Sequence, residues 1–362
     1  MIFKSPGAIF FELNIPWYGI AIGLIVILIV GLRMVRQWDL KRGSSEWWIV
    51  NTLLFTFIIC VVGRRVKDVL ATWNIYASNP IEALTAWTIP ITVRWYGVMI
   101  ALGFVAATYM AIRLAKRWEL DEEQIVNGAL ISFMGGVLGA RLYFVAISWD
   151  YFSHHPAEIL ATWLGGMSIH GGIIGGFLVA AIYCRYAKLP VLRCFDLGGT
   201  VIPLAQAIGR WGNFFNSEAF GKPVGNDFPL KLFIPKESRP YFPLSNYEYF
   251  HPTFLYECLW NLMIFCLLYF FISKKLAKYP GSTFAAYIAL YSIGRLLIEP
   301  IRVDSIMAGS TPIPIIASAV SLVASVACLI GLRSFYKRKA QPQEAGKETA
   351  SAEQDQTGNI KS

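Results

Sequence analysis

Charged residues are scarce in this chain of 362 residues, and their scarcity indicates the solvent for which the protein is built. Asp, Glu, Lys and Arg make up 15% of the sequence, whereas soluble domains usually carry about 25%. Hydrophobic residues make up 56%. This balance argues against an ordinary water-soluble protein and predicts a chain that lies in a lipid bilayer.

The sequence also lacks the patterns that mark bound metals and nucleotides. Its six cysteines show no paired spacing for a metal or redox site, so we expect them to be small apolar helix residues; they are Cys60, Cys184, Cys194, Cys258, Cys266 and Cys328. The glycine-rich stretch 171–176 lies within an apolar run, which favours helix packing or lipid approach over a phosphate loop. We therefore expect no metal and no cofactor.

Period-two alternation, the pattern of membrane β-barrel strands, is missing as well. The apolar stretches instead approach the roughly 20 residues that a helix needs to cross the hydrocarbon core. We count about nine, at 17–32, 47–63, 95–114, 126–147, 169–186, 197–208, 253–272, 284–298 and 313–332. The stretch 197–208 is short, and Pro203 is expected to break it. The sequence thus predicts an all-α, polytopic bundle of membrane helices.

A net charge of +9 would suit a nucleic-acid-binding protein, but the basic residues are distributed differently. They gather in alternate loops, near residues 33–42, 113–117, 185–193, 274–278 and 337–339, while the loop 148–163 has no Lys or Arg. This is the pattern of the positive-inside rule, so we expect no nucleic-acid partner. The basic loops and the C-terminus are predicted to be cytoplasmic, and a head segment, 214–252, extracytoplasmic. Arg64, Arg65 and Lys67 disagree with this topology, which leaves residues 47–93 open.

Both ends of the sequence differ from its middle. Residues 15–24 resemble residues 93–102, since both contain Trp-Tyr-Gly at the head of an apolar run. The first copy is either a duplicated helix or an ordinary interfacial anchor. Residues 337–362 are mostly polar and contain no aromatic side chain, so we predict a disordered tail.

Arginines inside apolar stretches are the first sign of function. Arg141 and Arg295 each cost about 2.5–3.5 kcal/mol at the centre of a membrane helix, so each should face a cavity, a partner or a ligand. Arg295, Glu299 and Arg302 fall at i, i+4 and i+7, on one helical face. A guanidinium group matches a phosphate, which favours anion binding. Glu299 either belongs to that site or forms an internal ion pair that fixes helix packing.

The densest polar motif spans residues 209–221. Arg210 supplies a cation, Asn213 an amide, Glu218 a carboxylate, and the glycines, Gly221 included, allow close approach of backbone or ligand. These groups exceed what a helix-ending loop requires. His170, in a glycine-rich segment, is a candidate base because its ordinary pKa of about 6.5 suits proton transfer, although it would also serve as a helix cap.

Two other classes of protein would share some of these features. A transporter or channel for a small anion would also carry intramembrane charge and a broken helix, but it should show paired, related halves. A membrane scaffold should scatter its polar residues over several faces. Here they gather near the predicted outer ends of the helices, and the detected repeat is only one helix long.

Read in order, the motifs resemble the prolipoprotein diacylglyceryl transferase family. The match covers about residues 94–333 and consists of Gly-Arg-x-Gly-Asn-x-x-x-x-Glu-x-x-Gly at 209–221, Arg-Trp-Tyr-Gly at 94–97, Gly-Ala-Arg at 139–141, His-Gly-Gly at 170–172, His-Pro-x-x-x-Tyr-Glu at 251–257 and Gly-Arg-x-x-x-Glu at 294–299. An intervening stretch of about 75 residues departs from the family pattern and adds two probable helices to the usual seven.

The resemblance implies a domain plan. Residues 1–93 would be an N-terminal extension with two membrane helices, residues 94–336 a catalytic membrane domain containing the head segment, and residues 337–362 a cytoplasmic tail. The family's functional tyrosine is carried over to Tyr96 rather than to Tyr18, because Tyr96 keeps the normal distance to Arg141.

The resemblance also implies a reaction. Such enzymes transfer the diacylglyceryl group of phosphatidylglycerol to the lipobox cysteine in the signal segment of a prolipoprotein, at the outer face of the bacterial inner membrane, and release glycerol phosphate. His170, Arg210 and Arg295 are then expected to be catalytic. Substrate binding is expected of Tyr96, Arg141, Asn213, Glu218, Gly221 and Glu299. His170 would take the thiol proton, unless water or the substrate itself does so.

Overall fold

Seven long apolar helices dominate the computed structural model, which describes residues 1–16, 88–159, 165–239, 244–305, 307–308 and 311–358. Each is long and apolar enough to cross a membrane; they span Trp95–Arg117, Glu122–Ile147, Ile169–Tyr186, Val191–Asn216, Thr253–Leu276, Ser282–Ile301 and Ile313–Lys339. The prediction of a polytopic helical membrane protein is therefore confirmed. The two predicted helices at 17–32 and 47–63 lie outside the described residues.

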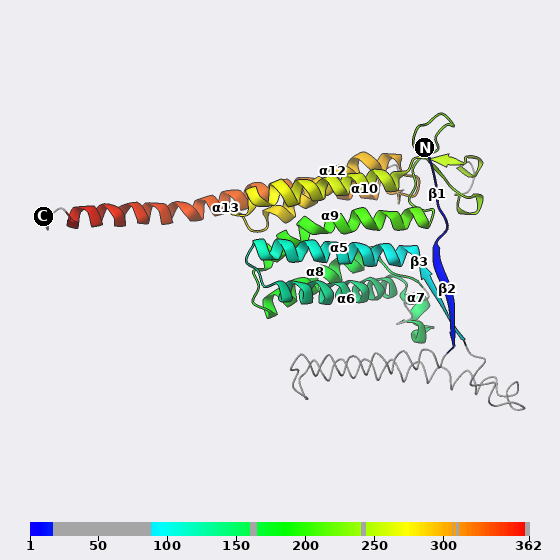
Figure 1. Cartoon of the computed structure of the whole chain (residues 1–362), viewed down its shortest axis with the longest axis horizontal. Coiled ribbons are helices and arrows are strands. Elements are labelled where there is room, and N and C mark those ends of the chain that lie inside the picture. Colours follow the sequence, from blue (N-terminus) through cyan, green and yellow to red (C-terminus); the bar gives the residue numbers. More distant parts are fainter. Residues whose placement is uncertain (17–87, 160–164, 240–243, 306, 309–310, 359–362) are drawn as a thin grey trace, which may run out of the picture. The chain divides into compact units, whose positions relative to one another are not determined.

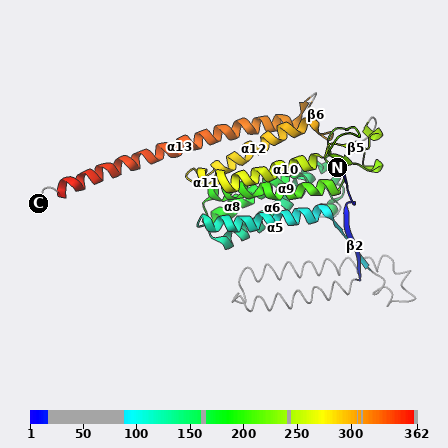
Figure 2. The ribbon, with the colours of Figure 1, turned by 45° about the horizontal axis from the view of Figure 1, so that its top comes forward.

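The helices pack in pairs, which Figures 1 and 2 show side by side. The most extensive contact joins α6 (Glu122–Ile147) to α8 (Ile169–Tyr186), and the next joins α5 (Trp95–Arg117) to α9 (Val191–Phe215). Helix α10 (Thr253–Cys266) packs on α9, and α12 (Ser282–Ile298) packs on α13 (Ile313–Gly358). Contacts between α5 and α6, and between α8 and α9, are much sparser.

Glycines allow the closest of these contacts. A Cβ atom added at Gly139 would lie 2.9 Å from the Cα atom of Gly175, and one at Gly175 would lie 3.0 Å from the Cα atom of Gly139. A Cβ atom at Gly103 would lie 2.9 Å from the carbonyl oxygen of Ala205. Small residues at these positions let the backbones of α6 and α8, and of α5 and α9, approach closely in the membrane.

Helix α9 corrects the expected break at Pro203. It runs without interruption from Val191 to Phe215, with Pro203 buried inside it. A proline removes one backbone donor, but neighbouring helices and hydroxyl groups compensate for this in membrane helices. One turn earlier, the hydroxyl of Thr200 donates a hydrogen bond to the carbonyl oxygen of Asp196, at 2.7 Å.

The Asp196 carboxylate links α9 to the first turn of α12. It accepts hydrogen bonds from the amides of Gly281, at 2.7 Å, and Phe284, at 2.8 Å, and its side chain is buried. Gly281 has a φ of 90°, a left-handed conformation that glycine adopts without strain. A carboxylate at a helix N-terminus satisfies free amides and complements the helix dipole.

At the other end of the bundle, the polar motifs are covered by a small head. Its three-stranded sheet has the order β1 (Ile2–Lys4), β4 (Lys231–Phe233) and β5 (Tyr249–Phe250), with β1 parallel to β4. Phe214, Phe250 and Phe254 contribute to a buried aromatic core beneath the sheet. Short 3₁₀ turns at Lys236–Ser238 and Leu244–Asn246 complete the described part of the head. The sheet adds a detail that the helical prediction lacked.

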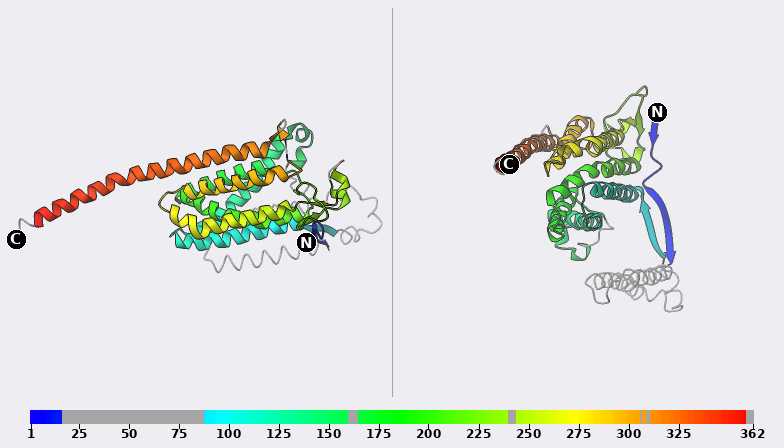
Figure 3. Two further views of the ribbon diagram at one scale, coloured as in Figure 1. Left: turned by 90° about the horizontal axis from the view of Figure 1, so that it is seen from above. Right: turned by 60° about the vertical axis from the view of Figure 1, so that its left-hand side comes forward.

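The remaining elements are short. Helix α7 (Trp149–Phe152) and a 3₁₀ turn (Pro156–Glu158) follow α6. A π-helical segment (Leu267–Ile272) and α11 (Ser273–Leu276) extend α10, a 3₁₀ turn (Glu299–Ile301) follows α12, and β6 (Met307–Ala308) pairs with β7 (Thr311–Pro312). Helix α13 begins beside α12 and continues to Gly358 (Figure 3). Residues 340–358, which belong to the tail that the composition predicted to be disordered, continue the backbone of this helix.

The chain divides into two units at the front. Met1–Ala8 belongs with Trp95–Ser362, whereas Ile9–Arg94 forms a second unit. Within the second unit, β2 (Ile9–Pro16) pairs antiparallel with β3 (Thr88–Arg94). The expected boundary of the N-terminal extension, 1–93, therefore differs from this division, because the first eight residues join the unit of the head.

Replacing Asp196 with Ala should destabilise the bundle, because the amides of Gly281 and Phe284 lose their acceptor. We expect a loss of roughly 1–3 kcal/mol, measured as a lower thermal unfolding midpoint of the full chain in detergent micelles. Asp196→Asn, which keeps one oxygen acceptor, should lose less. The exposed Asp150→Ala is the control and should leave the midpoint unchanged. Equal midpoints for Asp196→Ala and Asp150→Ala would contradict this role.

Candidate active site

Three arginines converge on one buried glutamate at the head end of the bundle. The Glu257 carboxylate, 4% exposed, lies 2.5 Å from Nε of Arg210, 3.1 Å from Nη1 of Arg295 and 2.9 Å from Nη1 of Arg302. The arginines come from α9, from α12 and from the residue after the 3₁₀ turn that follows α12. Residues separated by up to 92 positions thus share one carboxylate.

A second carboxylate lies beside the first. Glu299, 1% exposed, forms an ion pair with Arg295, lies 4.0 Å from Nε of Arg302 and accepts a hydrogen bond from Ser305 at 2.7 Å. The predicted face of Arg295, Glu299 and Arg302 is therefore one group in space. The internal ion pair that the sequence left open is present, and it lies inside the cluster of charges.

The charges of the cluster balance. Three guanidinium groups face three carboxylates: those of Glu257 and Glu299, which are buried, and that of Asp304, which is 44% exposed and accepts two hydrogen bonds from Arg302, at 2.8 and 3.0 Å. Arg210 is the most exposed arginine of the three, at 21%. It is therefore the arginine most accessible to an anion, and guanidinium groups suit oxygens of phosphate geometry.

A polar chain extends from Arg210 toward the head. Nη1 of Arg210 lies 3.5 Å from Oδ1 of Asn213, whose amide donates a hydrogen bond to Glu218 at 2.9 Å. Ser217 and Ala219, on either side of Glu218, have φ values of 53° and 55°. Non-glycine residues rarely adopt this left-handed conformation, which turns the chain sharply after α9 and returns Glu218 to Asn213.

Tyr96 packs against the same turn of α9. A Cβ atom at Gly212 would lie 2.7 Å from Cδ2 of Tyr96, so only glycine leaves room for this ring. Tyr96 is the second residue of α5 and is 37% exposed. The packing therefore holds the partly exposed phenol of Tyr96 against Gly212, which lies two residues after Arg210 in α9.

Gly221 closes the segment against the end of α12. Its amide donates to the carbonyl of His251 at 3.0 Å, and the next amide, of Lys222, donates to the carbonyl of Ile301 at 2.7 Å. A Cβ atom at Gly221 would lie 2.7 Å from Cβ of His251. Glycine at position 221 is thus required for the backbone bridge that places Arg302 beside the head. Burial also lowers the pKa of the neighbouring His251, which favours its neutral imidazole.

Arg141 has a different environment from the other arginines. Its side chain is 4% exposed and donates to four backbone carbonyls, of Glu158 at 2.6 Å, Ile159 at 2.8 Å, Gly165 at 2.6 Å and Gly166 at 2.8 Å. The structure therefore brings Arg210 and Arg295 together on Glu257, whereas Arg141 binds the loop between α7 and α8. The prediction that Arg141 would bind the same phosphate as Arg210 and Arg295 therefore differs from the contacts seen in the structure.

The same loop determines where His170 lies. His170 is the second residue of α8, and the amide of Ser168, which precedes the helix, donates to the carbonyl of Ala140 at 3.0 Å. The His170 side chain is exposed, and its ring centroid lies 6.3 Å from that of Tyr143. Arg141 thus acts on the segment that leads into the histidine.

Arg302 was predicted to share a helical face with Arg295 and Glu299, but neither Arg302 nor Glu257 was assigned a role, although both stand at the centre of the cluster. The available signal was the single carboxylate near the start of an apolar stretch, since such a charge needs partners. Its partners come from other helices, so spacing along its own helix does not identify them.

The chain matches one family of known proteins. Residues 85–331 match the family model described as prolipoprotein diacylglyceryl transferase. The chain is similar to proteins named phosphatidylglycerol–prolipoprotein diacylglyceryl transferase from several bacteria. The relative from Trichormus variabilis is 44% identical over 254 residues, which cover 69% of this chain and 88% of the relative. The relative from Fervidobacterium nodosum is 46% identical over 220 residues (60% and 73%), and that from Thermosynechococcus vestitus is 42% identical over 253 residues (70% and 92%).

Replacing Glu257 with Gln should destabilise the site, because three partly buried arginines would lose the charge of the buried carboxylate that they share. Breaking a buried ion pair by removing one partner costs about 3–5 kcal/mol. We expect a lower thermal unfolding midpoint of the full chain in detergent. Glu218→Gln, at a more exposed position, is the matched control and should shift the midpoint far less. If both variants have the same unfolding midpoint as the unmodified chain, Glu257 does not hold the cluster.

Replacing Arg141 with Lys should loosen the start of α8. A lysine keeps the charge but lacks the planar fork that reaches four carbonyls. Hydrogen exchange of the full chain in nanodiscs should become faster in peptides that contain Gly166 and Ser168, and should stay unchanged in α12. The control is Arg113→Lys, at an exposed position of α5. Unchanged exchange near Ser168 would show that Arg141 does not order this segment.

Proposed function

Because this chain belongs to the prolipoprotein diacylglyceryl transferase family, we propose that it moves the sn-1,2-diacylglyceryl group of phosphatidylglycerol onto the lipobox cysteine of a prolipoprotein. The products are a thioether-linked lipid on the protein and free glycerol phosphate, and the reaction begins bacterial lipoprotein maturation. The observation that carries the proposal is the convergence of Arg210, Arg295 and Arg302 on the buried Glu257 carboxylate.

In this proposal the arginine cluster binds the phosphodiester of the lipid. Glu257, Glu299 and Asp304 hold the guanidinium groups in place. Arg210, the most exposed of the three arginines, makes the first contact with the lipid phosphate. Arg295 is held from both sides, by Glu257 and Glu299, so it keeps its position while charge moves in the substrate.

The reaction exchanges one bond to carbon for another. The cysteine sulfur attacks the glyceryl carbon that carries the phosphate, a C–S bond forms, and the C–O bond to the phosphate breaks. The bonding electron pair leaves with the phosphate oxygen, so glycerol phosphate departs as an anion. Arg210 and Arg295 stabilise the charge that develops on that oxygen. Such stabilisation by fixed donors is usually the largest single contribution to the rate of a catalysed step.

The attacking thiol must lose its proton, because the thiolate is the effective nucleophile. His170 is the proposed acceptor of that proton, since its side chain is exposed on the first turn of α8. Arg141 positions the loop that leads into this turn through its four carbonyl contacts. Arg141 thereby contributes to substrate binding through the loop rather than through the phosphate cluster.

The remaining polar residues orient the lipid headgroup. Asn213 and Glu218 form a hydrogen-bonded pair next to Arg210 and present an amide and a carboxylate that suit the hydroxyls of a glycerol headgroup. Tyr96, whose ring packs on Gly212, adds a phenol beside the turn of α9 that contains Asn213. Gly221 contributes by its small size, because it lets the head approach the segment that carries Arg302.

The charge at the helix ends supports a sidedness for this chemistry. Lys116 and Arg117 end α5, Arg185 lies in the last turn of α8, and Lys274 and Lys275 lie in α11, all remote along their helices from the head. By the positive-inside rule, those ends face the cytoplasm. The arginine cluster and the head then belong to the extracytoplasmic leaflet of the bacterial inner membrane, with the C-terminus in the cytoplasm. The lipid donor and the prolipoprotein signal segment both reach the cluster from within the bilayer.

The structure weakens the alternative of a transporter for a small anion. That interpretation used the expected break in residues 197–208 as a sign of a discontinuous helix at an ion site. Helix α9 instead continues through Pro203, and the charges lie near helix ends at the head. A transferase site needs such a position, because its protein substrate must reach the lipid headgroup.

Replacing Arg210 with Ala should lower the rate of transfer by about 100- to 1,000-fold, the usual cost of one transition-state donor. The assay incubates purified full-length protein with labelled phosphatidylglycerol and a lipobox peptide, and counts the label on the cysteine. Arg185→Ala, at an exposed helix end, is the control and should transfer normally. A near-normal rate for Arg210→Ala would refute its role, and absence of label with the unmodified protein would refute the proposed function.

A further inference from the structure

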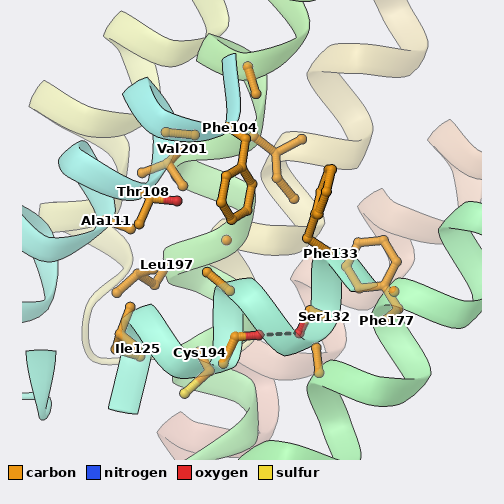
Figure 4. Close-up of a pocket in the computed structure, with 18 of the residues that line it drawn as sticks. Phe104, Thr108, Ala111, Ile125, Ser132, Phe133, Phe177, Cys194, Leu197 and Val201 are labelled. Carbon is orange, nitrogen blue, oxygen red and sulfur yellow. Dashed lines mark hydrogen bonds between the residues drawn. The ribbon is translucent and has the colours of Figure 1, made fainter. Parts of the chain in front are cut away.

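An apolar cavity of about 510 Å³ lies between the two closely packed helix pairs, α5 with α9 and α6 with α8 (Figure 4). We propose that this cavity holds one acyl chain of the lipid donor, and that Tyr183 at its far end limits the length of chain that fits. The inference rests on the proposed function, because it assigns a place to the tail of a lipid whose headgroup lies at the arginine cluster.

The walls have the chemistry that a hydrocarbon chain requires. Phe104, Phe133, Phe177, Leu197 and Val201 line the cavity, and Figure 4 shows side chains of this kind around it. The hydroxyl of Ser132, a polar group in the lining, donates to the carbonyl of Gly128 at 2.5 Å, so its polarity is already satisfied. The volume falls within the roughly 300–1,000 Å³ that is usual for small-molecule sites.

The near end of the cavity adjoins the site already described. Gln206 and Gly209 of α9 line it, and Gly209 directly precedes Arg210. A lipid whose phosphate lies at Arg210 therefore has the cavity entrance beside its glyceryl carbons. This continuity identifies the occupant as a chain of the lipid donor rather than as an unrelated apolar molecule.

The cavity is long enough for such a chain. It follows α9 from Gly209 back to Cys194, which is roughly 22 Å at about 1.5 Å per helical residue. The lipid chains of one leaflet occupy half of a hydrocarbon core that is about 30 Å thick. A chain that enters beside Arg210 therefore meets the far end of the cavity only when it is longer than about 15 Å, the depth of one leaflet.

A side opening provides the way in. Ile100, Phe133 and Ile173, from three different helices, line the cavity, and each is at least 40% exposed. Their exposed faces belong to parts of the helices that would lie in lipid. One acyl chain can enter between the two helix pairs, where contacts are sparse, while the second chain stays in the bilayer.

A hydrogen bond between helices spans the far end of the cavity. The hydroxyl of Tyr183 on α8 donates to Oε1 of Gln124 on α6, at 2.6 Å. Both residues line the cavity, together with Cys184 and Leu189. The Tyr183 ring lies against Gly128, where an added Cβ atom would be 3.0 Å from Cδ1 of the ring. This fixed ring forms a floor, and its removal should lengthen the cavity.

The test measures transfer from a series of phosphatidylglycerols that differ only in acyl length, with the full chain and a lipobox peptide in detergent micelles. Tyr183→Ala should shift the preference toward longer chains. Ala180→Phe, which fills the cavity one turn nearer the head, should lower kcat/KM for long chains by roughly tenfold relative to short ones, since overfilling a packed site is costly. Tyr183→Phe keeps the ring and should leave the preference close to normal.

Two control variants on the same helix separate the cavity from general effects on α8. Tyr186, 85% exposed, and Ile182, 59% exposed, point away from the packed core. Tyr186→Ala and Ile182→Phe should therefore retain the length preference of the unmodified protein. A shift of equal size in these controls would overturn the proposal, because the effect would then not arise in the cavity.

The outcomes distinguish this inference from the proposed function. If the unmodified protein transfers no label from any donor, the proposed function fails. If it transfers label but Tyr183→Ala and Ala180→Phe keep its length preference, the function stands and the length limit is overturned. Transfer from short-chain donors shows that a variant is folded. Should one cavity variant be inactive with every donor, the profile of the other decides the result.

Discussion

The structure depends on how positive charge is neutralised inside a bilayer. Three arginines near the head share Glu257 and Glu299, and these ion pairs draw α9, α10 and α12 toward one point. Separately, each charge would be costly in hydrocarbon. Together with Asp304 the two glutamates balance the arginines, and the partly exposed Arg210 is the group that an anionic lipid can reach. The cluster therefore stabilises the bundle and, under the proposed function, selects the ligand.

Much of the fold could be predicted from the sequence, because the length of an apolar stretch is a direct consequence of bilayer thickness. The spacing of apolar residues does not reveal which helices pair. That depends on close backbone contacts such as Gly139 with Gly175, which form only after folding. The continuity of α9 through Pro203 was also mispredicted, since membrane helices can contain a proline without being broken by it. The small head sheet escaped notice because its strands have only two or three residues.

The site could be predicted where its residues share one element. Arg295 and Glu299 are one helical turn apart, and Arg210 and Asn213 likewise, so their spacing placed them together. Glu257 was missed as the centre because its partners come from other helices. Arg141 illustrates the opposite limit. A buried arginine has the same appearance in sequence whether it faces a ligand or backbone carbonyls, and here it binds four carbonyls.

The parallel pairing of β1 with β4 has a consequence for how the protein is made. Phe3 pairs with Leu232, so the first strand of the head must wait until more than 220 further residues have left the ribosome. At about 5–20 residues per second, the wait is roughly 10 to 50 seconds. During this time several helices of the bundle are synthesised without the strand that completes the sheet above them. Assembly of the head is therefore a late event in biosynthesis, even though one of its strands is translated first.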